Sequence, residues 1–149
     1  MTVSWRDTPL NPANPAHSDH LISTNGRRAE RVMNHLSPLR DEVQDILLRY
    51  ANASDNEVCG LITVKQEVFP IENVHEEPRH NFFMDFESCS EVLNEILNIR
   101  KTHVLGIFHT HPNNQPWPSP RDIVGWPNPQ LKWRYWVITR KEVYEWRLV

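Results

Sequence analysis

Apolar side chains in residues 37–54 recur at helical spacing, which gives that segment one apolar face and predicts an amphipathic helix. Ser37 is a residue type that caps helices, and Pro38 suits the first helical position. The recurring apolar positions are Val43, Ile46, Leu47 and Tyr50. We therefore expect the ordered domain to begin at residue 37.

The next apolar segments are too short for helices and are typical of strands. Residues 57–64 (EVCGLITV) form a continuous apolar run, as in a buried strand. Residues 67–74 (EVFPIENV) follow closely and predict a hairpin partner. Because Pro70 cannot donate to a strand ladder, this partner is expected at an edge of the sheet.

The second half of the chain again has a predicted helix followed by predicted strands. Ser88 and Glu91 form a capping-box pattern before a helical segment at 92–101. Residues 103–111 (HVLGIFHTH) are apolar on both faces, which favours a central strand covered by helices on both sides. Two further strands are expected at 133–139 and 143–149. The order predicts a single α/β domain, a mixed sheet sandwiched by helices.

Residues 1–36 lack such a pattern. Pro9, Pro12 and Pro15 interrupt the segment, and its apolar residues are few and without a period. We expect residues 1–36 to be a flexible tail that is dispensable for folding, and residues 37–149 to be the domain.

Composition narrows the function classes. A length of 149 residues fits one domain. The net charge of −3 and the absence of a basic stripe argue against nucleic acid as a partner. No apolar run reaches the roughly 20 residues of a membrane helix, and no secretory signal core is present. With only two cysteines and no disulfide framework, a cytoplasmic protein is expected, or a phage protein in the host cytoplasm.

Two histidines close the strand at 103–111. His109 and His111 are two residues apart, so both imidazoles point to the same side of a strand and can reach one metal ion. In a chain with eight histidines, such a pair can arise by chance, so the pair alone does not indicate a metal site.

Ser119 and Asp122 follow after a loop rich in proline. Taken alone, SPRD is a helix start, with serine at the cap and an acid in the first turn. Together with the histidines, the four positions make a spaced pattern on a strand, a loop and a capped helix. Two imidazoles and one carboxylate suit Zn²⁺ and leave a fourth position for water.

Glu57 is the candidate general base. It directly precedes the buried strand and follows the polar turn NASDN, a place where a carboxylate meets the end of the sheet. A solvated turn acid is the alternative for this residue considered alone. A hydrolytic metal site needs such a proton acceptor beside the metal.

Glu57 within EVCGLI, followed by HTHPNNQPWPSPRD, resembles the motif of the JAMM metalloproteases, the active MPN or JAB domains. The family pattern is a glutamate, then His-(Ser/Thr)-His, seven residues, serine, two residues and aspartate. The resemblance covers about residues 38–149, and the segment PIENV with NFFMDF also looks like the family.

The resemblance implies one Zn²⁺ per chain bound by His109, His111 and Asp122. It implies that Glu57 is the general base and that Ser119 donates a hydrogen bond to the oxyanion. The implied fold is similar to that of the cytidine deaminases, although the P-C-x-x-C of those enzymes is missing, which disfavours deamination.

The family hydrolyses peptide or isopeptide bonds, often in the extended tails of ubiquitin-like proteins. We expect a protein or peptide substrate, with residues 75–83 and 113–118 as the walls of its groove and Trp117 at the rim or anchoring the loop. Two alternatives stay open, a phage tail-assembly peptidase and a non-catalytic MPN-type scaffold that binds a partner.

Overall fold

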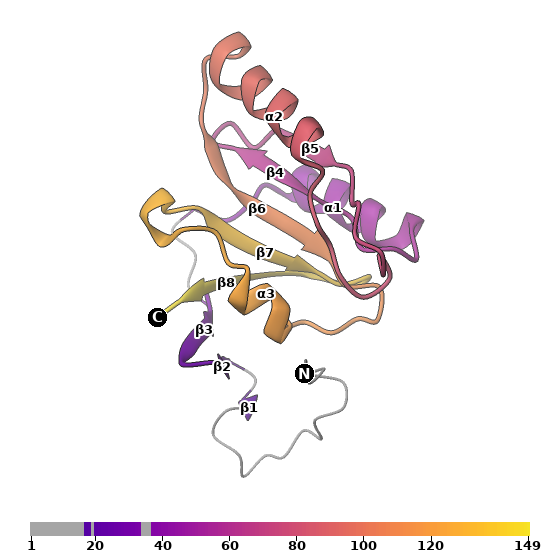
Figure 1. Cartoon of the computed structure of the whole chain (residues 1–149), viewed down its shortest axis with the longest axis vertical. Helices are drawn as coiled ribbons and strands as arrows, with labels where there is room; N and C mark the ends of the chain where they lie inside the picture. The colour runs from indigo at the N-terminus through magenta and orange to yellow at the C-terminus, as the bar shows by residue number, and fades with distance from the viewer. Residues whose placement is uncertain (1–16, 19, 34–36) are drawn as a thin grey trace.

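A computed structural model describes residues 17–18, 20–33 and 37–149 of the chain (Figure 1). The strands are β1 (His17–Ser18), β2 (Leu21–Thr24), β3 (Arg27–Arg31), β4 (Cys59–Thr63), β5 (Val68–Ile71), β6 (Val104–Thr110), β7 (Arg134–Ile138) and β8 (Val143–Leu148). The helices are α1 (Asp41–Ala53), α2 (Phe86–Asn94) with its π-helical continuation η2 (Glu95–Ile99), α3 (Pro120–Val124) and the 3-10 turn η3 (Pro129–Leu131).

Within these described ranges, eight strands form one sheet in the order β1-β2-β3-β8-β7-β6-β4-β5. The pair β6–β7 is parallel and every other pair is antiparallel, so the sheet is mixed. As predicted, the strand that carries the histidines is central. The strand that contains Pro70 lies at the edge, also as predicted.

Helices cover both faces of the sheet, which confirms the predicted sandwich. Side chains alternate along β6, so Ile107 and Phe108 enter two separate cores. Phe108 packs with Leu47 of α1, while Ile107 shares its core with Ile96 of η2 and Ile123 of α3. In Figure 1, α2 and α3 lie in front of the sheet and α1 lies behind it. None of the helices in the described part of the chain is long and apolar enough to cross a membrane.

Two helix starts differ from the prediction. The first helix begins at Asp41 rather than beside Ser37, because Arg40 is still extended and its backbone N–H donates to the Gln66 side chain at 2.8 Å. The second begins at Phe86, because the Asp85 carboxylate accepts from the backbone N–H of Ser88 at 2.9 Å. Asp85, and not Ser88, is therefore the cap of α2.

The prediction of a flexible tail up to residue 36 is wrong for its described part. Strands β2 and β3 form a hairpin, and β3 pairs with β8, so this segment, Leu21–Arg31, extends the sheet. We call it the N-terminal hairpin. Its turn is Asn25-Gly26, with φ of 50° and 76°, the two positive values of a type I′ turn. Residues 1–16, 19 and 34–36 lie outside the described residues.

Because the N-terminal hairpin docks on the sheet, truncating its buried residue Ile22, which is 1% exposed, is expected to destabilise the protein. Ile22→Ala should lower the free energy of unfolding by about 2–5 kcal/mol, the range for truncating a buried isoleucine. The matched control is Ser23→Ala, an exposed position on the same strand, which should stay within about 0.5 kcal/mol of the wild type. Urea unfolding of the three proteins measures this. Equal midpoints for Ile22→Ala and wild type would mean that the hairpin does not dock.

Candidate metal centre

The two histidines come from the end of β6 and face the same side of the sheet, as expected. Their Nε2 atoms are 3.0 Å apart. His109 is wholly buried and His111 is 3% exposed. The residue between them, Thr110, points to the other side, where its hydroxyl accepts from the backbone N–H of Val58 at 2.8 Å. Thr110 also donates its own N–H to Val58, so that N–H is not free to pair with a substrate.

Asp122 reaches the histidines from α3. Its Oδ2 atom lies 3.1 Å from His109 Nε2 and 3.3 Å from His111 Nε2. Ser119 holds this carboxylate in place through a capping box, in which its backbone N–H donates to Asp122 Oδ2 at 2.7 Å. The Ser119 Oγ atom accepts from the backbone N–H of Asp122 at 3.1 Å. This capping interaction does not use the hydroxyl hydrogen of Ser119.

Glu57 completes the cluster from the start of β4. In the antiparallel register Cys59 pairs with His109, and continuing that register puts Glu57 opposite His111 on the same face. Its Oε1 atom is 4.0 Å from His109 Nε2, and the residue is 3% exposed. The sequence-predicted base is thus beside the histidines and is not a solvated turn acid.

The backbone of Glu57 is fixed on both sides. Its N–H donates to the carbonyl of Pro78 at 2.7 Å, and its carbonyl accepts from Asn73 Nδ2 at 2.9 Å. Asn73 uses its whole amide, because Nδ2 also donates to Asn81 and Oδ1 accepts from the N–H groups of His75 and Phe83. This one side chain therefore ties Glu57 to the loop between β5 and α2.

That loop supplies a wall of the site. Phe82 stacks on the His109 ring with centroids 4.5 Å apart. Arg121 of α3 lies 3.0 Å from His75 Nε2, which links the loop to the helix that carries Asp122. Sequence reasoning placed residues 75–83 near the site but missed the roles of Phe82 and Asn73. The signal for Asn73 was its place inside the segment PIENV that resembles the family.

The electrostatics of the cluster pair a neutral His109 with an ionised Asp122, whereas the pKa of His111 is raised, because the carboxylates of Asp122 and Glu57 outweigh its burial. Burial lowers the pKa of His109, which keeps the ring in the form that binds metals. Burial would raise the pKa of Asp122, but the neighbouring His109 and His111 hold it well below its usual range. Tyr135, whose ring meets the edge of His109 at 5.5 Å, has its pKa raised by burial and by the carboxylates of Asp122 and Glu57.

The donor set fits a cation. His111 Nδ1 lies 2.6 Å from the carbonyl of Gln115, and since a carbonyl can only accept, Nδ1 carries the proton. In the neutral ring, His111 Nε2 therefore carries the lone pair, 3.3 Å from the Asp122 carboxylate, and a cation bound between these two atoms would take it up. Ligand atoms of a tetrahedral zinc lie roughly 3.3 Å from one another, given Zn–N distances of about 2.0–2.1 Å. The separations of 3.0, 3.1 and 3.3 Å match those edges.

Two ligand sets are compatible with the cluster. Glu57, His109 and His111 have ligand atoms within 4.8 Å of one another and could hold a metal ion. Asp122 Oδ2 lies within 3.3 Å of both Nε2 atoms, and Glu57 Oε1 lies 4.0 Å from that of His109. Asp122 contacts both histidines through one carboxylate oxygen, which makes it a candidate ligand beside Glu57.

The other residues singled out from the sequence take structural positions. Trp117 is half-buried against the core, and the neighbouring Pro116 carbonyl accepts from the Trp146 indole at 2.9 Å, so this part of the loop is anchored. Cys59 is buried, and burial followed by the charge of Glu57 raises its pKa to about 12, which excludes a reactive thiolate at neutral pH.

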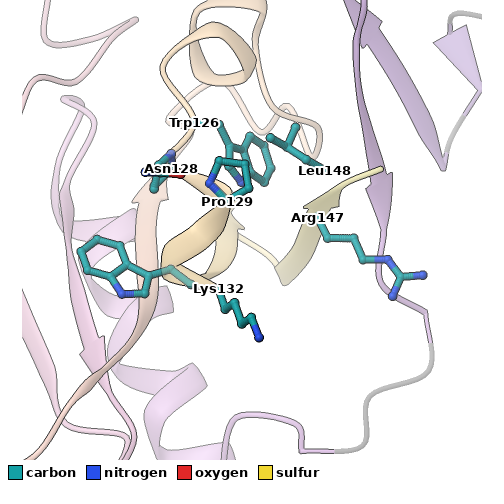
Figure 2. A pocket seen from close by; sticks show the side chains of 8 residues that line it. Trp126, Asn128, Pro129, Lys132, Arg147 and Leu148 are labelled. Carbon is teal, nitrogen blue, oxygen red and sulfur yellow. The ribbon is translucent and has the colours of Figure 1, made fainter.

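A pocket on the described part of the chain contains none of the residues of the cluster (Figure 2). It is lined by the connection from α3 to β7 and by the end of β8, including Trp126, Lys132 and Arg147. Trp126 stacks on Tyr135 at 3.8 Å, and Tyr135 in turn contacts His109. The pocket is therefore separated from the histidines by two aromatic rings, and in Figure 2 the Arg147 side chain points away from it.

Comparisons with known proteins identify the family and support the fold. The model of the family described as prokaryotic homologs of the JAB domain matches residues 40–149. Among solved structures, the solution structure of protein DSY2949 from Desulfitobacterium hafniense is 25% identical, with a TM-score of 0.50 over 66% of this chain and 70% of that chain. No curated protein matches the sequence. The chain belongs to the prokaryotic JAB domain family.

Proposed function

We propose that the protein is a zinc-dependent peptidase or isopeptidase that hydrolyses an amide bond in an extended segment of a protein substrate. His109, His111 and Asp122 would hold the zinc, Glu57 would act as general base, and Ser119 would stabilise the oxyanion. The observation that carries the proposal is the meeting of four buried side chains from the segment before β4, the end of β6 with the residue after it, and α3, with Glu57 Oε1 4.0 Å from His109 Nε2.

The distance of Glu57 supports a role in proton transfer. Its carboxylate can accept a proton from a water that attacks the scissile carbonyl, and can pass that proton to the leaving amine when the C–N bond breaks. The products are a carboxylate and a free amine. Bound zinc would lower the pKa of the attacking water from about 15.7 toward 7 and would polarise the scissile carbonyl.

Ser119 can contribute through the hydroxyl hydrogen that its cap interaction leaves over. A hydrogen bond from this group to the developing oxyanion would be worth roughly 2.7–4 kcal/mol of transition-state stabilisation, as in comparable sites. Because its backbone N–H also orients Asp122, the residue connects the oxyanion side to the ligand side of the site.

An extended chain is the substrate that suits such a site. Attack requires a carbonyl whose neighbours are held still, and flanking walls can do this for a flexible tail but not for a folded surface. Residues 75–83, with Phe82 on His109, and the loop at 113–118 supply those walls. The C-terminal tail of a ubiquitin-like protein has the required form.

The test is a cleavage assay on a ubiquitin-like protein fused through its C-terminal tail to a reporter, together with a set of unstructured peptides. Zinc-loaded protein should cut in the tail or linker and spare folded domains, and a chelator should abolish the cut. Mass spectrometry of the products locates the bond. Absence of cleavage of every extended substrate at saturating zinc would overturn the proposal in favour of a non-catalytic scaffold.

A further inference from the structure

Helix α3 brings Asp122 to the histidines but is too short to hold its own position. It has five residues, and only a few backbone hydrogen bonds lie within it or at its ends, such as Ile123 to Ser119 at 3.1 Å and Gly125 to Arg121 at 2.8 Å. Isolated helices of this length are unstable, so the orientation of α3 must come from the surfaces that it contacts.

One of those surfaces is the N-terminal hairpin, which touches the C-terminal end of α3. Arg27 Nη1 of β3 donates to the carbonyl of Ile123 at 3.1 Å and lies 3.3 Å from that of Val124. These carbonyls lie at the negative end of the helix, where a cation is favourable. The contact joins positions 96 residues apart in sequence, directly after Asp122.

The hairpin also packs against the apolar side of α3. Ala29 shares the strand face of Arg27 and pairs across the hairpin with Ile22. Both are buried in the same core as Ile123, which is 0% exposed. A charged contact and an apolar contact thus act together on the residue that follows Asp122.

This support comes from outside the part of the chain that matches the family model, which begins at residue 40. We infer that the N-terminal hairpin is a positioning element of the metal centre, with Arg27 as the residue that sets the place of Asp122 through α3. The inference rests on the proposed zinc site and goes beyond it, because it assigns part of the metal affinity to a segment that never touches the metal.

The test compares Arg27→Gln with Arg28→Gln, the adjacent exposed arginine on the opposite strand face. Zinc affinity is measured by competition with a chromophoric chelator at a temperature where every variant is folded. We expect Arg27→Gln to weaken zinc binding roughly threefold to tenfold, the scale of a helix-terminus cation. Arg28→Gln should match the wild type, and Arg27→Lys, which keeps the cation, should recover part of the loss.

Two further measurements separate positioning from general loss of stability. Val43→Ala on α1 lowers stability from the opposite face of the sheet and should leave zinc affinity unchanged. In metal-free protein, Arg27→Gln should speed amide exchange at Ile123 and Gly125, whereas Arg28→Gln should not.

The inference would be overturned if Arg27→Gln exchanged its α3 amides at the same rate as the wild type and bound zinc with the same affinity. An affinity loss no larger than that of Val43→Ala would also overturn it. Failure of the wild type to bind zinc would instead refute the proposed function, and the exchange rates would then decide on the role of Arg27 alone.

Discussion

Glu57→Gln is expected to reduce hydrolysis about 10²–10⁴-fold, the usual contribution of a positioned general base, while zinc binding persists. The amide has nearly the same shape as the carboxylate but cannot accept the proton of the attacking water. Because the Glu57 backbone is held by Pro78 and Asn73, the fold around the substitution should not change. The measurement is the single-turnover rate on a cleaved fusion, beside the zinc content of the same sample.

The matched control for this substitution is Glu76→Gln, an exposed acid in the wall loop, which should cleave at the wild-type rate. Cleavage by Glu57→Gln at that same rate would show that Glu57 is not the base. Loss of zinc together with activity would point instead to Glu57 as a metal ligand.

Removal of a metal ligand should have the second large effect. His109→Ala and Asp122→Asn each take away one of three ligands, so zinc affinity should fall by more than the roughly 10–100-fold that loss of an outer-shell partner costs. Asp122→Asn keeps the side-chain volume, which separates lost coordination from a cavity at the buried His109 site. Elemental analysis after dialysis against a weak chelator measures retained metal.

Zinc should also stabilise the wild type against heat and leave both variants unchanged, because only a ligand that binds the folded state raises its stability. Free zinc at 100 times its dissociation constant would add about 2.7 kcal/mol to the wild type. The control is His103→Ala, an exposed histidine before β6, which should behave as wild type. Equal zinc retention by all four proteins would refute the ligand assignment.

The sequence predicted the central and edge places of two strands around the cluster because those places follow from local patterns. Residues 103–111 are apolar on both faces, which required a central strand, and Pro70 required an edge. The motif spacing likewise placed His109, His111 and Asp122 together, since a strand, a loop and a capped helix leave few other arrangements.

The N-terminal hairpin was missed although a signal was present. Asn25-Gly26 is the residue pair that a two-residue type I′ turn prefers, and LIST and RRAER flank it. The flanking strands looked too polar to count as strands, because β3 presents only Ala29 fully to the core. Their pairing depends on β8, more than a hundred residues later in the chain, which local patterns do not reveal.

The roles of Asn73 and Phe82 were missed for a different reason. Each acts through tertiary contacts, Asn73 by hydrogen bonds to three separate backbone segments and Phe82 by stacking on His109. A single asparagine in a loop carries no periodic or spacing signal that would indicate such contacts.

Zinc is expected between His109, His111 and Asp122, with Glu57 outside its bonds. Anomalous scattering at the zinc edge from crystals of the zinc-loaded protein tests this most directly. We expect one peak per chain, about 2.0–2.2 Å from both Nε2 atoms and from a carboxylate oxygen of Asp122, with Glu57 too far for a direct bond. No peak at the histidines, or a peak bonded to Glu57 in place of Asp122, would contradict it.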